Sequence, residues 1–264
     1  MTAKLAVVGG GRMGEALVTG LLAAGWAGAG EVTVVEKLPD QRRRLAARHP
    51  GVSVAEVLPP SPDAVIAVKP NDVQDACAGL SAARVQRVLS IAAGVPLRRL
   101  EQWLPEGTAV VRAMPNTPAL VGAGAAAVAA GRSAGEQDLA WAEAILSSVG
   151  VVVRVPESLL DAVTGLSGSG PAYVFLVAEA LVDAGVLVGL PGDVSSALTL
   201  QTMLGAARML NETGDTPQAL RAAVTSPGGT TAAGLSVLEA KGLRAAILEA
   251  VAAATERSHQ LGQA

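Results

Sequence analysis

The chain has 264 residues, of which 50% are hydrophobic and 16% are charged, and its net charge is −3 at pH 7. Disordered segments combine low hydrophobicity with high net charge, so this composition excludes a wholly disordered chain. Nucleic-acid binding is not expected either, because basic residues are not in excess and the three Trp, one Tyr and one Phe provide no stacking surface for bases. A single cysteine excludes an intrachain disulfide, and no Cys/His group has the spacing of a metal site.

A membrane protein is also not expected. The longest uncharged apolar stretch, Ala113–Gly131, is interrupted by the polar and proline-containing segment Pro115–Pro118. A membrane-spanning helix needs about 20 predominantly apolar residues in a row. The chain passes from Lys4 directly into Leu5–Val8, without the apolar segment and cleavage site of a secretory signal. We therefore expect a cytoplasmic protein.

The first 155 residues alternate short β-branched runs with longer segments typical of helices. This alternation predicts parallel βαβ units in one sheet that is covered by helices on both faces. The expected strands are Leu5–Val8, Val32–Val35, Ala64–Val68, Arg87–Ile91, Ala109–Arg112, Ala125–Ala129 and Val151–Val155. The expected helices in this half are Met13–Ala24, Pro39–Arg48 and Glu136–Val149.

After Pro156 the pattern contains helical periods alone. The expected helices are Pro171–Gly189, Asp193–Thr213, Pro217–Val224 and Pro227–Gln260. The fold class is therefore α/β, with a Rossmann-type, doubly wound and mostly parallel sheet followed by an all-α region. The expected domain boundary divides residues 1–156 from residues 157–264.

A glycine-rich turn follows the first expected strand directly. Leu5–Val8 runs into Gly9-Gly10-Gly11-Arg12-Met13-Gly14, and a helical segment follows. In such a G-x-G-x-x-G pattern, Gly9 allows the tight turn, Gly11 the close approach of a pyrophosphate, and Gly14 the packing of helix on strand. The helix N-terminus offers N–H groups and a partial positive charge to the phosphates. The context favours a dinucleotide site over a glycine-rich turn without a function.

The end of the second expected strand bears on the choice of cofactor. Glu36 lies 22 residues after Gly14, where an acidic side chain binds the ribose hydroxyls of NAD and should repel the 2′-phosphate of NADP. Lys37 and the run Arg42–Arg44 could neutralise that phosphate, although a basic run on a helix is usually a solvated face. We expect NADH or NADPH, with a slight preference for NADH.

A Ser-Pro-Gly-Gly-Thr-Thr segment opens the last expected helix. Ser226 is expected as the N-cap and Pro227 as the first helical residue. The glycines that follow would leave N–H groups of the first turn unshielded for a small carboxylate, with two threonine hydroxyls beside it. The alternative is an ordinary capped helix start. The residues expected to form this carboxylate site are Ser226, Gly228, Gly229, Thr230 and Thr231.

A second glycine-rich turn is expected at Ser167–Pro171, either to bind a ligand or to permit close packing. Elsewhere the chain offers few acid/base residues. His49 and His259 are both expected at the surface, and Lys241 is the one lysine of the helical half. Reduction of a ketone needs a positioned acid, whereas a protonated iminium already carries its proton. The shortage therefore favours reduction of a C=N bond.

Six segments together resemble the pyrroline-5-carboxylate reductase family over essentially the whole chain. They occur in the family's order and at its spacing. They are Val8–Ala16, Ala67–Pro70, Ser90–Gly94, Met114–Pro118, Gly165–Tyr173 and the Ser226–Thr231 segment followed by Ala232–Glu239. One departure is Arg12, where many members have Asn or Gln.

The resemblance implies NAD(P)H-dependent reduction of 1-pyrroline-5-carboxylate to L-proline, the last step of proline biosynthesis. In the helical half it implies that backbone N–H groups from Ser226 to Thr230 hold the substrate carboxylate and that Val224 lines the ring pocket. The hydroxyl of Thr231, the implied catalytic residue, would bind the ring nitrogen, and a further proton-relay role stays open. The implied cofactor-binding residues are Gly9, Gly10, Gly11, Arg12, Met13, Gly14, Glu36, Ala67, Val68, Lys69, Pro70, Ile91, Ala92, Ala93 and Asn116.

Two of these residues keep alternative roles. Lys69 either contacts a cofactor phosphate or ribose, or forms a structural ion pair while its neighbours contribute backbone groups. Asn116 either lies near the nicotinamide or serves as a simple turn residue.

The helical half also predicts self-association. Segments 178–190 and 243–254 have little polar face, and such helices must be buried. We expect an obligate homodimer through the C-terminal helices and, from the resemblance, a ring of dimers, with no metal, nucleic acid or membrane as partner. Two other functions compete: a β-hydroxyacid-type dehydrogenase, which needs a lysine in the helical half, and a non-catalytic NAD(P)-binding regulatory protein.

Overall fold

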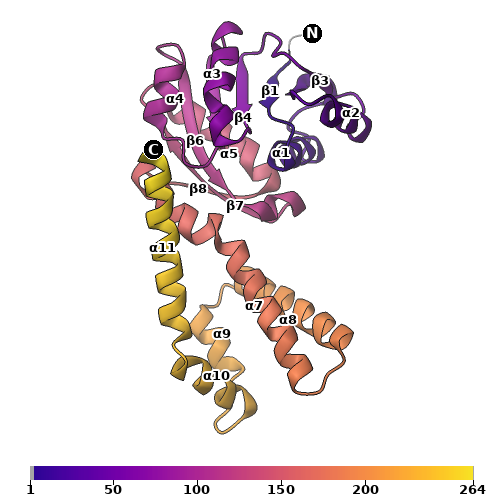
Figure 1. Ribbon diagram of the computed structural model, residues 1–264, viewed down its shortest axis with the longest axis vertical. Helices are drawn as coiled ribbons and strands as arrows, with labels where there is room; N and C mark the ends of the chain where they lie inside the picture. The colour runs from indigo at the N-terminus through magenta and orange to yellow at the C-terminus, as the bar shows by residue number, and fades with distance from the viewer. Residues whose placement is uncertain (1–2, 264) are drawn as a thin grey trace. The chain divides into compact units, whose positions relative to one another are not determined.

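The computed structural model describes residues 3–263 and divides the chain into two compact units (Figure 1). One unit comprises Met1–Ser169 together with Ala252–Ala264, and the other comprises Gly170–Val251. The last strand ends at Arg154, close to the change of pattern at Pro156. The first unit nevertheless extends past the sheet to Ser169.

The first unit contains one eight-stranded sheet in the order β3-β2-β1-β4-β5-β6-β7-β8. All neighbouring strands are parallel except β6 and β7, which are antiparallel. This confirms the predicted doubly wound, mostly parallel sheet. The strands are β1 Leu5–Val8, β2 Val32–Val35, β3 Ser53–Ala55, β4 Asp63–Ile66, β5 Arg87–Ser90, β6 Ala109–Pro115, β7 Gly124–Ala130 and β8 Gly150–Arg154.

Each of the seven predicted strands is present, and β1 and β2 have the predicted bounds. The sequence did not predict β3. This strand has three residues and lies at the sheet edge, none of its side chains is fully buried, and it therefore lacks the apolar run that marks the others. Its position matters because the residues that follow it border the functional site.

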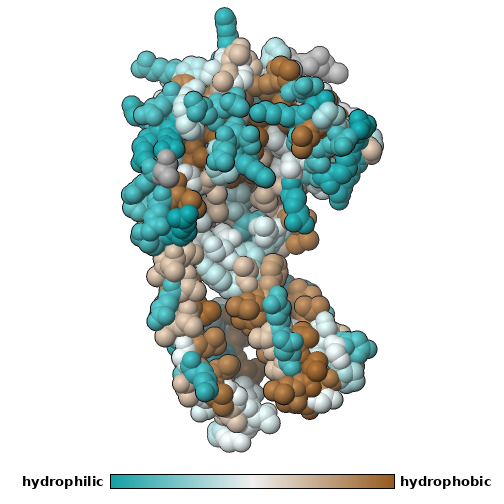
Figure 2. Space-filling view, viewed as in Figure 1, coloured by the Kyte–Doolittle hydropathy of each residue, from teal (hydrophilic) through white to brown (hydrophobic). Residues whose placement is uncertain are grey.

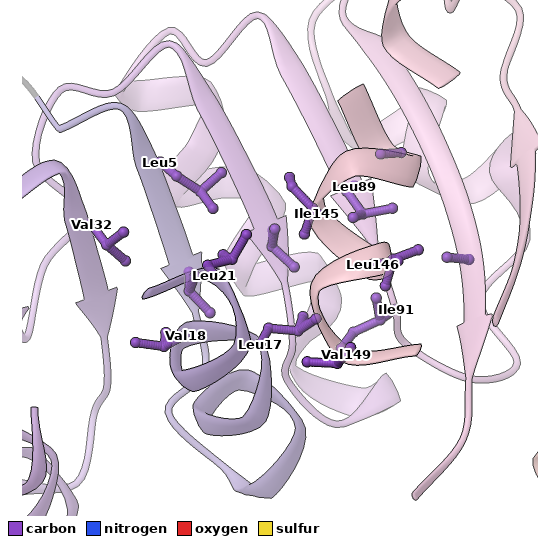
Figure 3. Close-up of a cluster of buried hydrophobic side chains, with 14 of the residues drawn as sticks. Leu5, Leu17, Val18, Leu21, Val32, Leu89, Ile91, Ile145, Leu146 and Val149 are labelled. Carbon is purple, nitrogen blue, oxygen red and sulfur yellow. The ribbon is translucent and has the colours of Figure 1, made fainter. Parts of the chain in front are cut away.

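Helices cover both faces of this sheet, as predicted. The helices are α1 Arg12–Ala23, α2 Pro39–Arg48, α3 Val73–Ala82, α4 Leu97–Trp103, α5 Glu136–Leu146 and α6 Leu160–Val163. One buried cluster joins α1 and α5 to the strands through Leu17, Leu21 and Ile145 (Figure 3). A separate cluster contains Leu80 of α3 and Leu100 of α4. Because neighbouring strand residues contribute to different clusters, the strands are apolar on both faces.

Cys77 of α3 is fully buried in the second of these clusters. Burial raises the pKa of its thiol to about 11, because the thiolate would lose its hydration. We therefore expect the folded protein to resist alkylation by iodoacetamide at pH 8 and the denatured protein to react fully, as mass spectrometry would measure. Rapid alkylation of the folded chain would show that the thiol is accessible.

The rest of the chain is helical, and no described residue after Arg154 belongs to a strand. The expected single helix Pro227–Gln260 is wrong, because it is two helices separated at Lys241–Gly242, where Gly242 has a φ of 76°. A left-handed residue ends an α-helix, and glycine adopts that conformation without a steric penalty. The helices are α7 Gly170–Leu187, α8 Gly192–Glu212, α9 Pro217–Ala223, α10 Thr230–Ala240 and α11 Leu243–Gln263.

The helical unit has almost no interior of its own. Of residues 170–251, all of which the structure describes, only Ser195 is buried. Large apolar side chains such as Phe175, Leu187 and Leu248 are 60%, 86% and 72% exposed, and Figure 2 shows much hydrophobic surface over these helices. The continuous helical stretch Glu157–Leu187, which includes α6 and α7, is long and apolar enough by composition to cross a membrane, and an 18-residue part of it has a mean hydropathy of 1.5. The sequence did not predict a stretch of this kind.

Candidate functional site

The carboxyl ends of the central strands meet at one edge of the sheet. Val8 of β1 is in register with Val35 of β2 and with Ile66 of β4. The residues that follow these strands therefore lie side by side. Between β1 and β4 the strand order reverses direction, and ligands of open α/β sheets bind in the crevice at such a point.

The glycine turn between β1 and α1 has little room for side chains on its inner side. Gly9 has a φ of 107°, and a Cβ atom there would lie 2.6 Å from the carbonyl oxygen of Ala67 in the neighbouring loop. A Cβ at Gly14 would clash with the carbonyl oxygen of Gly9. At Gly11 the situation is reversed, because nothing lies within 4 Å of a Cβ built there. Gly11 thus faces an open space against bare backbone, which suits a pyrophosphate.

This space belongs to a cleft of about 560 Å³ at the sheet edge. The cleft contains predicted cofactor residues from three separate segments, which the fold brings together. It also contains apolar and acidic residues that the sequence did not single out. Its lining is Val8, Gly9, Gly11, Val35, Glu36, Lys37, Leu38, Glu56, Val57, Leu58, Ala67, Val68, Lys69, Asp72, Asp75, Ala76 and Gly79.

The cleft has an apolar part next to its charged part. Leu38 and Val57 are 65% and 77% exposed, although most large apolar side chains of this unit are buried. Exposed apolar groups in the lining of a cleft suit a flat ring such as adenine. The sequence did not reveal Glu56–Leu58, because these residues follow the short strand β3 that carries no apolar signal.

Glu36 is held in place by backbone groups. Its two carboxylate oxygens accept hydrogen bonds from Gly10 N–H at 3.0 Å and from Leu38 N–H at 2.9 Å. Gly10 therefore contributes through its backbone, although it does not line the cleft. The carboxylate is fixed at the end of β2, where ribose hydroxyls would meet it.

The basic side chains near the cleft differ in their partners. Arg43 pairs with Asp40, and Arg44 pairs with Glu15 at 2.6 Å. Lys69 is exposed, lines the cleft and forms no ion pair with any described residue. The structural ion pair that was one of its two expected roles is therefore absent from the described part of the chain, and its charge is available to a ligand.

The other predicted cofactor residues lie outside the cleft lining. Arg12 and Met13 begin α1 with side chains that do not line it, and Pro70 begins a short 3-10 turn, Pro70–Asp72. In the loop after β5, the side chains of Ile91 and Ala92 are buried, so only backbone groups of these two residues can reach a ligand, whereas Ala93 is exposed.

Asn116 uses both atoms of its side-chain amide inside the protein. Its Nδ2 donates to the carbonyl oxygen of Ser167 at 3.1 Å, and its Oδ1 accepts from Ala125 N–H at 2.8 Å. The side chain therefore joins the loop after β6 to the segment around Ser167. This positioning contact is more than a simple turn residue would make, and the expected place of Asn116 near the nicotinamide stays a prediction.

The expected turn Ser167–Pro171 is wrong. Residues Thr164–Gly168 form a π-helix that continues from α6, and α7 begins at Gly170. Gly168 packs close to the first unit's sheet, since a Cβ there would lie 2.7 Å from the Met114 methyl carbon. Close packing is thus the role that the structure gives to this glycine. π-Helical turns inside α-helices frequently occur at functional sites.

Comparisons with known proteins identify the family. A family model described as pyrroline-5-carboxylate reductase dimerisation matches residues 157–261, and one described as NADP oxidoreductase, coenzyme F420-dependent, matches residues 4–94. The chain is 46% identical over 273 residues to a pyrroline-5-carboxylate reductase of Synechocystis sp., covering 100% of both chains. The chain belongs to the pyrroline-5-carboxylate reductase family. It is therefore an oxidoreductase that uses NAD(P)H.

Other members of the pyrroline-5-carboxylate reductase family show the same likeness. A relative from Methanosarcina acetivorans is 46% identical over 268 residues and covers 98% of both chains. The solved pyrroline-5-carboxylate reductase of Coxiella burnetii superposes with a TM-score of 0.92 at 36% identity, covering 99% of each chain. The Plasmodium falciparum pyrroline carboxylate reductase, solved with NADP bound, gives a TM-score of 0.84 at 30% identity over 98% of each chain.

The second part of this reductase's predicted site lies in the helical unit, before α10. The sequence predicted Ser226 as the N-cap and Pro227 as the first helical residue, and both predictions are wrong. Instead Gly229 N–H donates to the Ser226 carbonyl oxygen at 3.1 Å, which closes a turn over Pro227 and Gly228, and Gly228 has a φ of 71°. Such a turn places proline second and a left-handed glycine third, and the glycine pair therefore forms a loop outside the helix.

Helix α10 begins at Thr230 with Gly229 as its N-cap, and no side chain caps this end. A Cβ at Gly229 would lie 2.5 Å from the Ser226 hydroxyl oxygen, so the loop closes tightly against the helix start. The Thr231 hydroxyl makes no hydrogen bond to any described residue and is available to a ligand. The unshielded first-turn N–H groups are those of Thr230, Thr231 and Ala232, one turn later than predicted.

The remaining acid/base candidates are accounted for. Lys241 is the C-cap of α10, at the opposite end of that helix from Thr231 and about 15 Å away at 1.5 Å per residue. The predicted surface position of His49 is wrong, because its side chain is only 9% exposed and lies 3.7 Å from Glu15. Glu15 belongs to α1, so His49 lies against that helix, and His259 is exposed near the end of α11.

Proposed function

We propose that this chain transfers a hydride from NAD(P)H to the C=N bond of 1-pyrroline-5-carboxylate and releases L-proline, the last step of proline biosynthesis. The observation that carries the proposal is that this chain has two sites of the required kind. The open space at Gly11 fits a pyrophosphate, and the uncapped start of α10 fits a carboxylate. The full-length likeness to proteins named pyrroline-5-carboxylate reductase supports the substrate.

The residues of the cleft fit a reduced dinucleotide, which supplies the hydride when bound. The backbone of Gly9–Gly14 and the start of α1 hold the pyrophosphate, since a side chain at Gly11 would fill its place. Glu36 binds ribose hydroxyls with a carboxylate that Gly10 and Leu38 orient. Lys69 offers its unpaired charge to a phosphate or ribose, and backbone groups of Ala67–Pro70 and Ile91–Ala93 complete the site.

In this proposal the all-helical region of residues 157–264 provides substrate binding and dimerisation. The carboxylate is bound by those N–H groups of the Ser226–Thr230 loop and the start of α10 that have no partner within the loop, since Gly229 N–H donates to Ser226; the positive end of the helix dipole aids this binding. The Thr231 hydroxyl binds the ring nitrogen and orients the imine. Val224, which is 61% exposed, lines the ring pocket. The protonated imine accepts hydride at carbon, and its nitrogen keeps the proton as an amine.

The test is to mix purified protein with 1-pyrroline-5-carboxylate and either NADH or NADPH and to follow the absorbance of the reduced nicotinamide. The proposal predicts substrate-dependent oxidation. If the protein bound the cofactors but showed no turnover with either, the proposal would be wrong and the alternative of a non-catalytic NAD(P)-binding protein would be favoured. Oxidation of β-hydroxyacids with NAD(P) in place of imine reduction would favour the dehydrogenase, although Lys241 lies at the far end of α10.

We expect NADH to be preferred over NADPH because Glu36 carries a negative charge at the ribose end of the cleft. Replacing Glu36 with alanine should lower kcat/KM for NADH about tenfold and raise the relative use of NADPH, since charge-assisted hydrogen bonds to ribose are lost. Steady-state kinetics with both cofactors checks this. A variant with the cofactor preference of the wild type would remove Glu36 from the recognition of ribose.

The exposed apolar side chains of the helical unit support a homodimer and, as the family likeness leads us to expect, a further ring of dimers. Burial of apolar surface at about 25 cal/mol per Å² is the main stabilising contribution to such an interface. We expect light scattering at micromolar concentration to give at least twice the monomer mass. In this proposal the protein is cytoplasmic, and its macromolecular partner is a second copy of the chain and neither a membrane nor a nucleic acid. A monomeric mass would contradict the interface.

A further inference from the structure

Arg42 lies beside the ribose end of the cleft but does not line it. Its guanidinium donates from Nη1 to the carbonyl oxygens of Glu36 at 2.9 Å and Lys37 at 2.8 Å. Its Nη2 pairs with the Glu56 carboxylate at 3.0 Å. All three partners line the cleft, so Arg42 supports this rim through its contacts and does not itself line the cleft.

Glu56 owes its place to strand pairing. The Glu36 N–H donates to the carbonyl oxygen of Ala55 at 2.9 Å, as the last backbone contact between β2 and β3. Glu36 and Glu56 therefore follow neighbouring strands at the same edge. The Glu56 side chain is 66% exposed and borders the cleft, whereas the Arg42 side chain is 22% exposed. Glu56 thus adds a second carboxylate at the ribose end and also occupies the nearest guanidinium.

We propose that Glu56 is a specificity-determining residue that disfavours cofactors with a 2′-phosphate by holding Arg42 against the backbone of residues 36–37. The inference rests on the proposed function only for the presence of a dinucleotide in this cleft. Arginine is well suited to bidentate binding of phosphate, so a released Arg42 would create the site that NADPH needs. With Glu56 in place, three of the five guanidinium donors are used, and a second carboxylate beside Glu36 adds negative charge at this end of the cleft.

The experiment measures binding of nucleotide fragments, which requires neither substrate nor turnover. Isothermal titration calorimetry gives Kd for 5′-AMP and for 2′,5′-ADP, which differ in the 2′-phosphate alone. In the wild-type protein 5′-AMP should bind more tightly. In Glu56→Gln the affinity for 2′,5′-ADP relative to 5′-AMP should rise about tenfold, which corresponds to ~1.4 kcal/mol. The double variant Glu56→Gln with Arg42→Gln should lose this gain.

Asp40→Asn is the matched control. It removes the carboxylate that pairs with Arg43, an arginine on the same helix as Arg42. Asp40 and Arg43 are 90% and 75% exposed and lie outside the cleft lining. Its ratio of affinities should stay that of the wild type. An unchanged ratio in Glu56→Gln would overturn the inference, as would a gain that persists in the double variant. If the wild-type protein bound neither fragment nor NADH, the cofactor site of the proposed function would fall as well.

Discussion

Replacing Thr231 with alanine is expected to lower kcat/KM for 1-pyrroline-5-carboxylate about a hundredfold. The hydroxyl lies in the first turn of α10, has no hydrogen-bond partner among the described residues, and would bind the ring nitrogen of the substrate. Loss of a positioning contact at the reacting group reduces the fraction of bound substrate in a reactive geometry. Steady-state kinetics gives kcat/KM, and fluorescence titration should show NADH affinity within about twofold of the wild type.

Thr225→Ala is the matched control for this prediction. It removes a threonine hydroxyl from the same connection between α9 and α10, but that hydroxyl donates to the carbonyl oxygen of Arg221 at 2.6 Å. Its kcat/KM should remain close to that of the wild type. An unchanged kcat/KM in Thr231→Ala would reject the role of this hydroxyl, and an equal loss in both variants would point to disruption of the loop.

Gly11→Ala is expected to weaken NADH binding about a hundredfold while leaving the fold intact. Nothing lies within 4 Å of a Cβ at this position, and the backbone at Gly11, with a φ of −69°, is accessible to alanine. The methyl group would occupy the space of the pyrophosphate, and a misplacement of about 1 Å can cost a hundredfold. Titration calorimetry with NADH and denaturant unfolding measure the two effects separately.

Gly14→Ala, in contrast to Gly11→Ala, should lower the stability of the fold. Its Cβ would clash with the carbonyl oxygen of Gly9, a backbone atom that cannot move without opening the turn. Overpacking of this kind typically destabilises a protein by about 1–3 kcal/mol, which urea unfolding would detect. A stable Gly14→Ala protein, or a Gly11→Ala protein with wild-type affinity for NADH, would contradict the geometry of the turn.

The sequence predicted the part of the site whose signal is local. The glycine turn follows the apolar strand Leu5–Val8, and Glu36 follows the apolar strand Val32–Val35. The two strands are parallel, so both signals lie at one edge of the sheet. The cleft accordingly contains Gly9, Gly11 and Glu36. The sequence could not predict that Glu56 borders the site, because it is adjacent to Glu36 only through the pairing of β2 with β3, a strand of three residues without an apolar pattern.

The start of α10 and the segment around Ser167 illustrate a different limit. Serine followed by proline is typical of both a helix N-terminus and a tight turn, and the tight turn is formed here because Gly228 can adopt a φ of 71°. Glycines and serines near Ser167 resemble a turn, but tertiary contacts override their local preference. The Asn116 side chain binds the Ser167 carbonyl oxygen, and Gly168 packs near Met114, within a π-helix.

The most direct test of the proposed reaction follows the transferred hydrogen. Purified protein is supplied with 1-pyrroline-5-carboxylate and NADH that carries deuterium at both C4 positions of the nicotinamide, and the product is analysed by mass spectrometry and NMR. Hydride transfer to the C=N bond predicts L-proline with a single deuterium, on the ring carbon that adjoins nitrogen and does not carry the carboxylate. Proline without deuterium at that carbon, or no proline at all, would contradict the assignment.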